Sequence, residues 1–116
     1  MYQLSEEEYG QVLPFFEGLQ VDRLAALSVI RGTYPGRIFV DRKKGPTAAL
    51  IGASTCYLGG NERNAVFNEQ LKDLLATEIL PGLEGRPLFI FSTSDEWKNT
   101  VDELLKDYSV IRVSSI

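Results

Sequence analysis

The sequence predicts a single α/β domain, a sandwich in which a mixed sheet lies between helices. Strand-like and helix-like segments alternate after residue 60, which is typical of parallel strands joined by helical crossovers. Three strand-like segments follow one another between residues 36 and 60, which indicates an antiparallel portion. The 116 residues contain no repeat, linker or low-complexity tract, so we expect one domain over residues 1–116.

The first third of the chain predicts a short strand, "MYQL", followed by two helices. Ser5 and Glu8 have the spacing of a capping box for the first helix. Pro14 kinks this helix or begins its second part, because proline has no N–H to donate to the carbonyl four residues back. We expect Asp22 to cap the second helix and Gly32 to end it. The apolar positions of that second helix are Leu24, Leu27 and Ile30.

The middle of the chain predicts three consecutive strands. "RIFVD" places Ile38 and Val40 on one face of the first strand, because side chains alternate along a strand. "RKKGP", residues 42–46, is typical of a solvated hairpin connection. "TAALIGA" and "TCYLGG" are the second and third strands.

The second half of the chain alternates helix, strand, helix and strand. We expect Pro81-Gly82 to end the first of these helices and Ser94 to cap the second. "PLFIFS" is apolar throughout, which predicts a central strand covered on both faces, and "VIRV" is the last strand. The apolar stripes of the two helices are Phe67, Leu71, Leu74, Leu75 and Ile79, then Trp97, Val101, Leu104, Leu105 and Tyr108.

Composition excludes several kinds of chemistry. The chain has no histidine and one cysteine, so a Ser-His-Asp triad, a Cys-His pair and a zinc site are excluded and we expect no metal. Catalysis would have to use Asp, Glu, Tyr, Lys or backbone amides, which fits direct transfer between two bound substrates. Cys56 is interpreted as a half-buried thiol in a cytoplasmic protein.

Net charge and hydropathy argue against two classes of partner, nucleic acids and membranes. The net charge of −4 argues against nucleic-acid binding, which usually requires a basic surface. No apolar run approaches the roughly 20 residues of a membrane span, and no signal peptide opens the chain. We therefore expect neither nucleic acid nor a membrane among the partners.

Four segments carry a resemblance to a known family: "LSEEEYGQVLPFFEGL", "SVIRGTYPGRIFVD", "AALIGASTCYLGGNERNAVFNEQLKDLLATEILP" and "DEWKNTVDELLKD". Their order and spacing resemble the GNAT N-acetyltransferase superfamily, lacking only its usual last strand. They are more similar still to the amino-terminal region of a bacterial GNAT-acetyltransferase family. The resemblance covers nearly the whole chain and depends on no single motif.

The resemblance implies acetyl-CoA as donor and a primary amine as acceptor. In such enzymes the amine attacks the thioester directly, a carboxylate or water takes its proton, and a tyrosine often protonates the leaving thiolate. Tyr108 lies near the position of that tyrosine, but it also completes an apolar helix stripe, so we favour a core role for it. Cys56 and Tyr57 lie on the strand that would line a CoA channel, and strand packing explains them as well. Trp97 is interpreted as a core residue.

The resemblance also places the pyrophosphate of CoA on backbone amides in the segment "GGNERNA", residues 59–65. Glycines and a helix N-terminus can bind an anion, and Arg63 could add a charged contact. The usual signature (Arg or Gln, two residues, Gly, one residue, then Gly or Ala) is absent, and Glu62 would repel phosphate. We therefore favour a turn and helix cap over pyrophosphate binding. The candidate cofactor residues are Gly59, Gly60, Asn61, Arg63 and Asn64.

The family that the chain resembles generally continues into a carboxy-terminal acetyltransferase domain that carries the cofactor motif. We therefore expect the amino-terminal half of a tandem enzyme, or a relic of one, weak or inactive alone. Its last strand would be covered by that second domain or by a second copy in a homodimer. The alternatives are an interaction or dimerisation module without CoA binding and a complete small acetyltransferase with an atypical phosphate loop. A generic nucleotide binder is least favoured, because the chain lacks a lysine-bearing phosphate loop.

Overall fold

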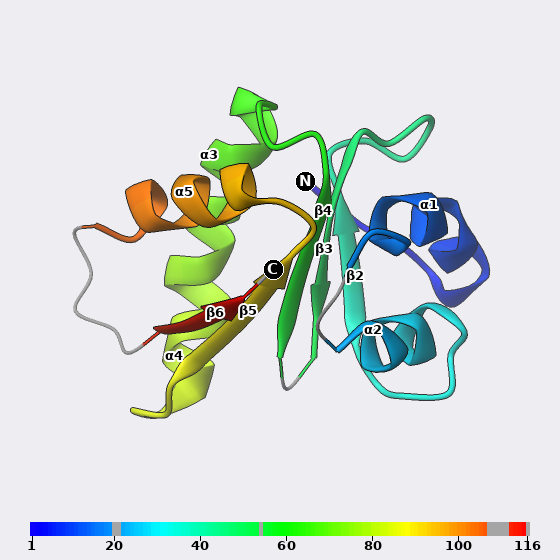
Figure 1. Cartoon of the computed structure of the whole chain (residues 1–116). Helices are drawn as coiled ribbons and strands as arrows, with labels where there is room; N and C mark the ends of the chain where they lie inside the picture. Colours follow the sequence, from blue (N-terminus) through cyan, green and yellow to red (C-terminus); the bar gives the residue numbers. More distant parts are fainter. Residues whose placement is uncertain (20–21, 54, 107–111, 116) are drawn as a thin grey trace.

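The computed structural model describes residues 1–19, 22–53, 55–106 and 112–115, the last range by its backbone alone. Six strands form one sheet in the order β1-β2-β3-β4-β5-β6, with helices on both faces (Figure 1). The first four strands pair antiparallel, and β4, β5 and β6 pair parallel, as expected for a mixed α/β sheet. The strands are β1 (Tyr2–Gln3), β2 (Arg37–Val40), β3 (Ala48–Gly52), β4 (Cys56–Gly60), β5 (Leu88–Ser92) and β6 (Arg112–Ser115).

The helices form two layers, one on each face of the sheet. The layer of η1, α1 and α2 packs on β2, β3 and β4, whereas α3, η2, α4 and α5 pack on the other face (Figure 1). The helices are the 3₁₀ helix η1 (Glu6–Val12), α1 (Leu13–Phe16), α2 (Arg23–Ile30), α3 (Ala65–Leu74), the π-helical η2 (Leu75–Ile79), α4 (Leu80–Leu83) and α5 (Asp95–Leu104). No described helix combines the length and the apolar composition that a membrane span requires.

The alternation of side chains along the strands builds two separate cores. Ile38 and Val40 share one face, as predicted, and are buried against η1, α1 and α2, whereas Phe39 between them is buried against α3 and α5. The two cores lie on opposite faces of the sheet. A residue's position in a strand therefore decides which helical layer it contacts.

The beginning of the chain folds as the capping box and the proline predict. The Oε1 atom of Glu8 accepts hydrogen bonds from the backbone N–H and the hydroxyl of Ser5, at 3.1 and 2.8 Å. A 3₁₀ helix runs to Val12, and α1 then begins at Leu13 with Pro14 in its first turn. Of the two roles considered for Pro14, beginning the second part is confirmed.

The second helix differs from prediction in its cap and in its buried face. Asp22 occupies the N-cap position at φ 62°, but its side chain caps no helix amide among the described residues. Of the predicted apolar face, Ile30 is buried, whereas Leu24 is 77% exposed and Leu27 is only partly buried. Both sets of positions have helical spacing, so periodicity alone cannot distinguish them. The residues that this helix buries are Ala26, Val29 and Ile30.

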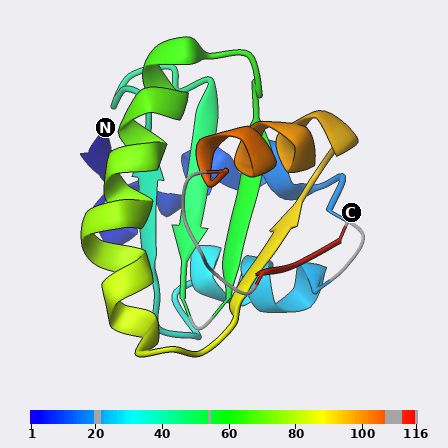
Figure 2. The ribbon, with the colours of Figure 1, turned by 90° about the vertical axis from the view of Figure 1, so that its left-hand side faces the viewer.

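The prediction that Pro81-Gly82 ends the third helix is wrong. α3, η2 and α4 form one continuous helix along the sheet (Figure 2). In the π-helical η2 the N–H of Leu80 donates to the carbonyl of Leu75, and α4 then begins with Pro81 in its first turn, where proline is tolerated. The helix ends instead at Glu84 and Gly85, which have φ values of 52° and 85°.

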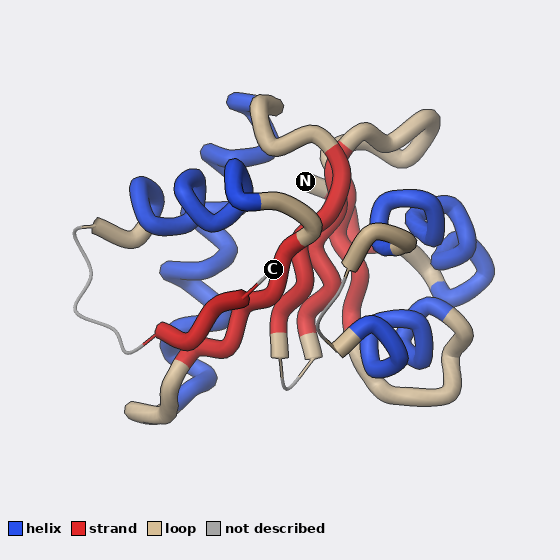
Figure 3. Tube along the Cα trace, in the orientation of Figure 1, coloured by secondary structure: helices blue, strands red, loops and turns tan. Residues whose placement is uncertain are grey.

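The prediction that β5 is covered on both faces is also wrong. Leu88 and Ile90 are buried against α3 and α5, but Phe89 on the other face is 39% exposed. Figure 3 shows β5 and β6 extending away from the layer of α1 and α2. The layer of α3 and α5 therefore covers one face of β5. On the other face Phe91 is partly buried against the core of the α1 and α2 layer, and only the part that bears Phe89 remains open.

Candidate functional site

The two candidate glycines of the phosphate-like loop lie at the end of β4, and contacts within the chain explain both. A Cβ atom on Gly59 would lie 2.6 Å from the carbonyl oxygen of Phe15 and 3.1 Å from a ring carbon of Phe16. Gly60 has a φ of 92° and its Cα faces the backbone of Thr47, so a side chain there would be both strained and crowded. Close packing and a turn require these two glycines.

Three backbone amides of the loop donate hydrogen bonds within the chain. The N–H of Asn61 donates to the carbonyl of Thr47 at 2.7 Å. The N–H of Arg63 donates to the side-chain oxygen of Asn61 at 3.0 Å, and the N–H of Asn64 to the carbonyl of Asn61 at 3.4 Å. The side-chain oxygen of Asn64 accepts from the N–H of Phe67 at 3.0 Å and so caps α3. A diphosphate would have to compete with these bonds.

Two carboxylates of the chain itself lie at the positive N-terminal end of α5. The Nε atom of Arg63 contacts Oε2 of Glu96, in the first turn of α5, at 3.1 Å. The carboxylate of Glu62 accepts a long hydrogen bond, 3.4 Å, from the hydroxyl of Ser94, the predicted cap of α5. That hydroxyl in turn accepts from the N–H of Trp97 at 3.3 Å. The negative charge that helix N-termini favour is thus supplied by the chain.

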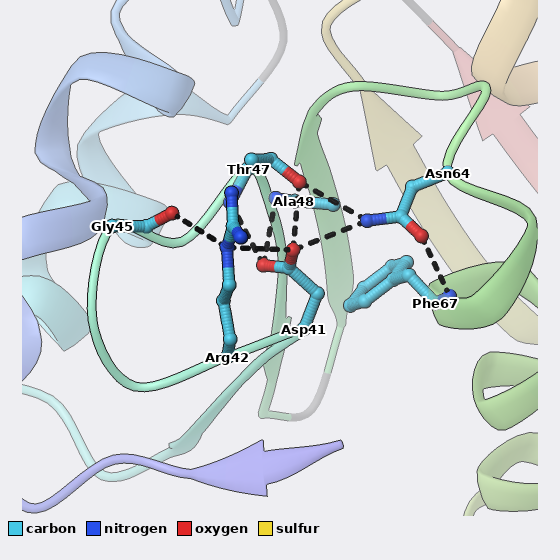
Figure 4. A network of polar contacts seen from close by, with 7 residues as sticks. All are labelled: Asp41, Arg42, Gly45, Thr47, Ala48, Asn64 and Phe67. Carbon is cyan, nitrogen blue, oxygen red and sulfur yellow. Dashed lines mark hydrogen bonds and ion pairs between the residues drawn. The ribbon is translucent and has the colours of Figure 1, made fainter.

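A partly buried carboxylate, that of Asp41, joins the loop to the hairpin between β2 and β3 (Figure 4). The side chain of Asp41 accepts hydrogen bonds from the hydroxyl and the N–H of Thr47 at 2.7 and 2.8 Å, and from the N–H of Ala48 at 3.2 Å. The Nδ2 atom of Asn64 donates to the same carboxylate at 3.1 Å. Burial alone would raise the pKa of Asp41, but the hydrogen bonds from Thr47 and Ala48 outweigh it and lower that pKa.

Trp97 closes the loop from the side of α5. It is fully buried, as predicted for a core residue, and its indole N–H donates to the carbonyl of Gly60 at 3.2 Å. Its ring meets that of Phe67 edge to face, with 6.0 Å between the centroids. The end of β4 is therefore tied to both helices of this face.

The residues considered for acid-base or thiol chemistry have structural surroundings. Tyr108 lies outside the described residues. Cys56 is buried rather than half-buried, and burial raises the pKa of its thiol to about 12, so the thiol is protonated at neutral pH. The Tyr57 hydroxyl donates to a carboxylate oxygen of Asp22 at 3.1 Å. Burial, then this contact, raises the pKa of Tyr57.

Sequence reasoning missed two features of this region. The hydrogen bond between Tyr57 and Asp22 joins residues 35 positions apart, so no local sequence pattern predicts it. A cavity of about 330 Å³ also opens at the opposite end of β4, beside Cys56. Its sequence signal is a cluster of small residues at the turn between two strands. Among the described residues, no group of three His, Cys, Asp or Glu side chains is placed to hold a metal ion.

Comparison with known families gives one match. A family model described as GNAT acetyltransferase matches residues 14–113. The matched region includes all of β2 to β5 and the whole phosphate-like loop. No curated protein matches the chain.

Proposed function

Because the chain belongs to the GNAT acetyltransferase family, we propose that it is an acetyltransferase-like domain with little or no activity of its own. Its role is that of the non-catalytic amino-terminal domain beside a catalytic acetyltransferase domain. Members of this family generally bind acetyl-CoA, so the state of the phosphate-like loop is the point on which the proposal depends.

The hydrogen bonding of that loop is the observation that carries the proposal. A helix N-terminus binds phosphate when its N–H groups point at the anion without other acceptors. Here Asn61 and Arg63 donate their backbone N–H groups to acceptors in the chain, and Glu96 pairs with the guanidinium that would meet the phosphate. These contacts support the inference that the loop does not hold a diphosphate, and we derive no catalytic step through acetyl-CoA bound at this loop.

Thermal unfolding with and without acetyl-CoA tests this proposal. A ligand at 100 times its dissociation constant adds about 2.7 kcal/mol to stability, which raises the midpoint by several degrees. We expect no such shift for this chain. A clear shift that Arg63→Ala removes and Arg31→Ala leaves unchanged would instead support the complete small acetyltransferase. Arg31 is the matched control because it is exposed and lies at the end of α2.

The open side of β5 and β6 favours a second candidate, an interaction or dimerisation module without CoA binding. Among the described residues, β6 pairs with β5 alone, so its other edge is available to a strand of a partner domain or a second copy. Phe89 adds a partly exposed ring at the open part of β5. Such edges and apolar faces are usual places for association.

Light scattering at increasing protein concentration tests this second candidate. A homodimer module predicts a mass that doubles with concentration, and Phe89→Ser would shift that transition to higher concentration. A constant monomer mass would count against the homodimer. An acetyl-transfer assay of a protein in which the domain precedes a catalytic one, with and without this domain, would then distinguish the two roles.

A further inference from the structure

The cavity of about 330 Å³ lies between the second half of the long helix and the end of the sheet where β3 turns into β4 and β5 begins. We call it the basal cavity. Its volume is at the lower end of the range of roughly 300 to 1,000 Å³ typical of small-molecule sites. Since β4 is extended, roughly 13 Å of backbone separates Cys56 beside the cavity from Gly60 in the loop. Its main apolar walls are Phe39, Leu74, Ile79, Leu83, Leu88 and Phe89.

The sequence leaves this space open from both sides. On the sheet, the lining residues at the turn between β3 and β4 include Gly52 and Ala53, whose side chains are too small to reach the helix. On the helix, the wider turn of η2 and the proline that follows it change the direction of the side chains of α4. Leu83 is only partly buried although it packs on the same core as α3. The helix therefore turns apolar side chains toward a space that the sheet does not fill.

Three charged side chains line the basal cavity beside the apolar walls, two cations and one anion. The guanidinium of Arg37 lies 3.4 Å from the carboxylate of Glu78 and 4.8 Å from the centroid of the Phe39 ring. Arg86 donates from Nε to the carbonyl of Leu83 at 2.8 Å and from Nη2 to that of Gly82 at 3.0 Å. Because Glu78 is matched by Arg37, the lining retains one positive charge, at Arg86.

We propose that the basal cavity binds a small apolar carboxylate, with its alkyl chain against the helix and β5 and its carboxylate at Arg86. The hydrogen bonds to the helix carbonyls hold that guanidinium in place and use two of its five N–H donors. A carboxylate suits the planar donors that remain. An alkyl amine would meet a lining with a net positive charge, because Glu78 is paired with Arg37, and an alcohol would lack the ionic contact. The site is separate from the phosphate-like loop and does not depend on acetyl-CoA.

Isothermal titration with three probes of equal chain length tests this proposal on the whole chain. We expect octanoate to bind with one-to-one stoichiometry, 1-octanol at least tenfold more weakly, and octylamine without measurable heat. Equal binding of octanoate and octylamine would overturn the proposal, because it would indicate non-specific apolar adsorption. Absence of octanoate binding at millimolar concentration would overturn it as well.

Two variants locate the binding. Leu83→Trp fills the basal cavity with a larger side chain at a partly buried position, and we expect it to abolish octanoate binding. Arg86→Gln should weaken octanoate at least tenfold and leave 1-octanol unchanged, whereas Arg31→Gln, beyond the opposite face of the sheet, should change neither. Circular dichroism and the unfolding midpoint of each variant establish that it is folded. Unchanged octanoate binding in both folded variants would place the ligand elsewhere and overturn the assignment.

Discussion

The two ends of the strand pair β3–β4 carry similar small residues and have opposite surroundings. At the loop end, Gly59 and Gly60 meet the backbones of Phe15 and Thr47 so closely that no Cβ fits. At the basal end, a Cβ on Gly52 would find its nearest neighbour 3.9 Å away, and a cavity lies beside it. Gly59 and Gly60 before α3 therefore suggested a ligand site, but the chain's own backbone fills the space beside them. The space that a ligand can occupy lies at the other end.

The largest effect is expected from a methyl group at the loop end. Gly60→Ala forces a left-handed φ on alanine and pushes its Cβ into the backbone of Thr47, which we expect to cost about 3 kcal/mol of unfolding free energy. The matched control is Gly52→Ala, where ordinary contact predicts a change within about 1 kcal/mol. Urea denaturation of both variants measures the difference. Equal stabilities would remove the contrast between the two ends.

Trp97→Phe tests the contact that closes the loop from α5. The change keeps an aromatic ring but leaves the carbonyl of Gly60 without the indole donor and leaves a small void, so we expect a loss of about 2 kcal/mol. Chemical denaturation followed by circular dichroism measures it, because the variant lacks tryptophan. A stability equal to that of the parent chain would show that the indole N–H does not hold the loop.

Asn64→Ala removes the cap of α3 together with the amide that reaches the Asp41 carboxylate. We expect a loss of about 1 to 2 kcal/mol, since a cap is worth about 1 kcal/mol and the partly buried carboxylate also loses a donor. Asn99→Ala, at an exposed position within α5, is the control and should be neutral or slightly stabilising. Thermal unfolding of the two variants ranks them, and a reversed order would contradict this cap.

The pH dependence of stability follows from Asp41, whose pKa is lowered in the folded chain from the ordinary 3.8. A depressed folded pKa means that the contribution is fully present above the ordinary value and is lost as the pH falls through the folded pKa. Asp41→Asn should therefore flatten the decline in unfolding free energy below pH 3.8. Denaturation curves at a series of acidic pH values measure the slope. An unchanged slope would assign the acid sensitivity to other carboxylates.

The smallest effect is expected from Arg63→Ala. The side chains of Arg63 and Glu96 are 79% and 51% exposed, and such ion pairs contribute about 0 to 1 kcal/mol. We expect the unfolding free energy to change by less than about 0.5 kcal/mol, and we expect high salt to make this change smaller still because it screens the ion pair. Urea denaturation at low and high salt measures it. A loss above 2 kcal/mol would mean that this arginine is a structural part of the loop.

The order of elements and the class of the sheet could be predicted from sequence because they depend on local patterns. Ser5, Glu8 and Pro14 act within one or two turns, and the sequence places them correctly. Two of the errors, at Leu24 and at β5, concern contacts between distant segments. Leu24 has the right spacing for a core position but the helix turns it to solvent, and the uncovered face of β5 depends on where another layer ends.

The candidate site was predicted less completely for the same reason. The sequence favoured a turn and a helix cap in this loop, and the hydrogen bond from the N–H of Phe67 to the side chain of Asn64 confirms the cap. It gave no sign that Glu96 lies beside Arg63, because 33 residues separate them. It also gave no sign that Arg37 and Arg86 border one cavity, since that requires the strand order and the path of the long helix.

The position of Trp97 has a practical consequence. The chain contains a single tryptophan, and its indole is bonded to the last residue of β4. Its fluorescence emission therefore reports on the contact between α5 and the end of β4. Exposure of the Trp97 indole to water would shift its emission maximum to longer wavelength, so no added label is needed. An alkyl carboxylate bound in the basal cavity would leave that maximum unchanged.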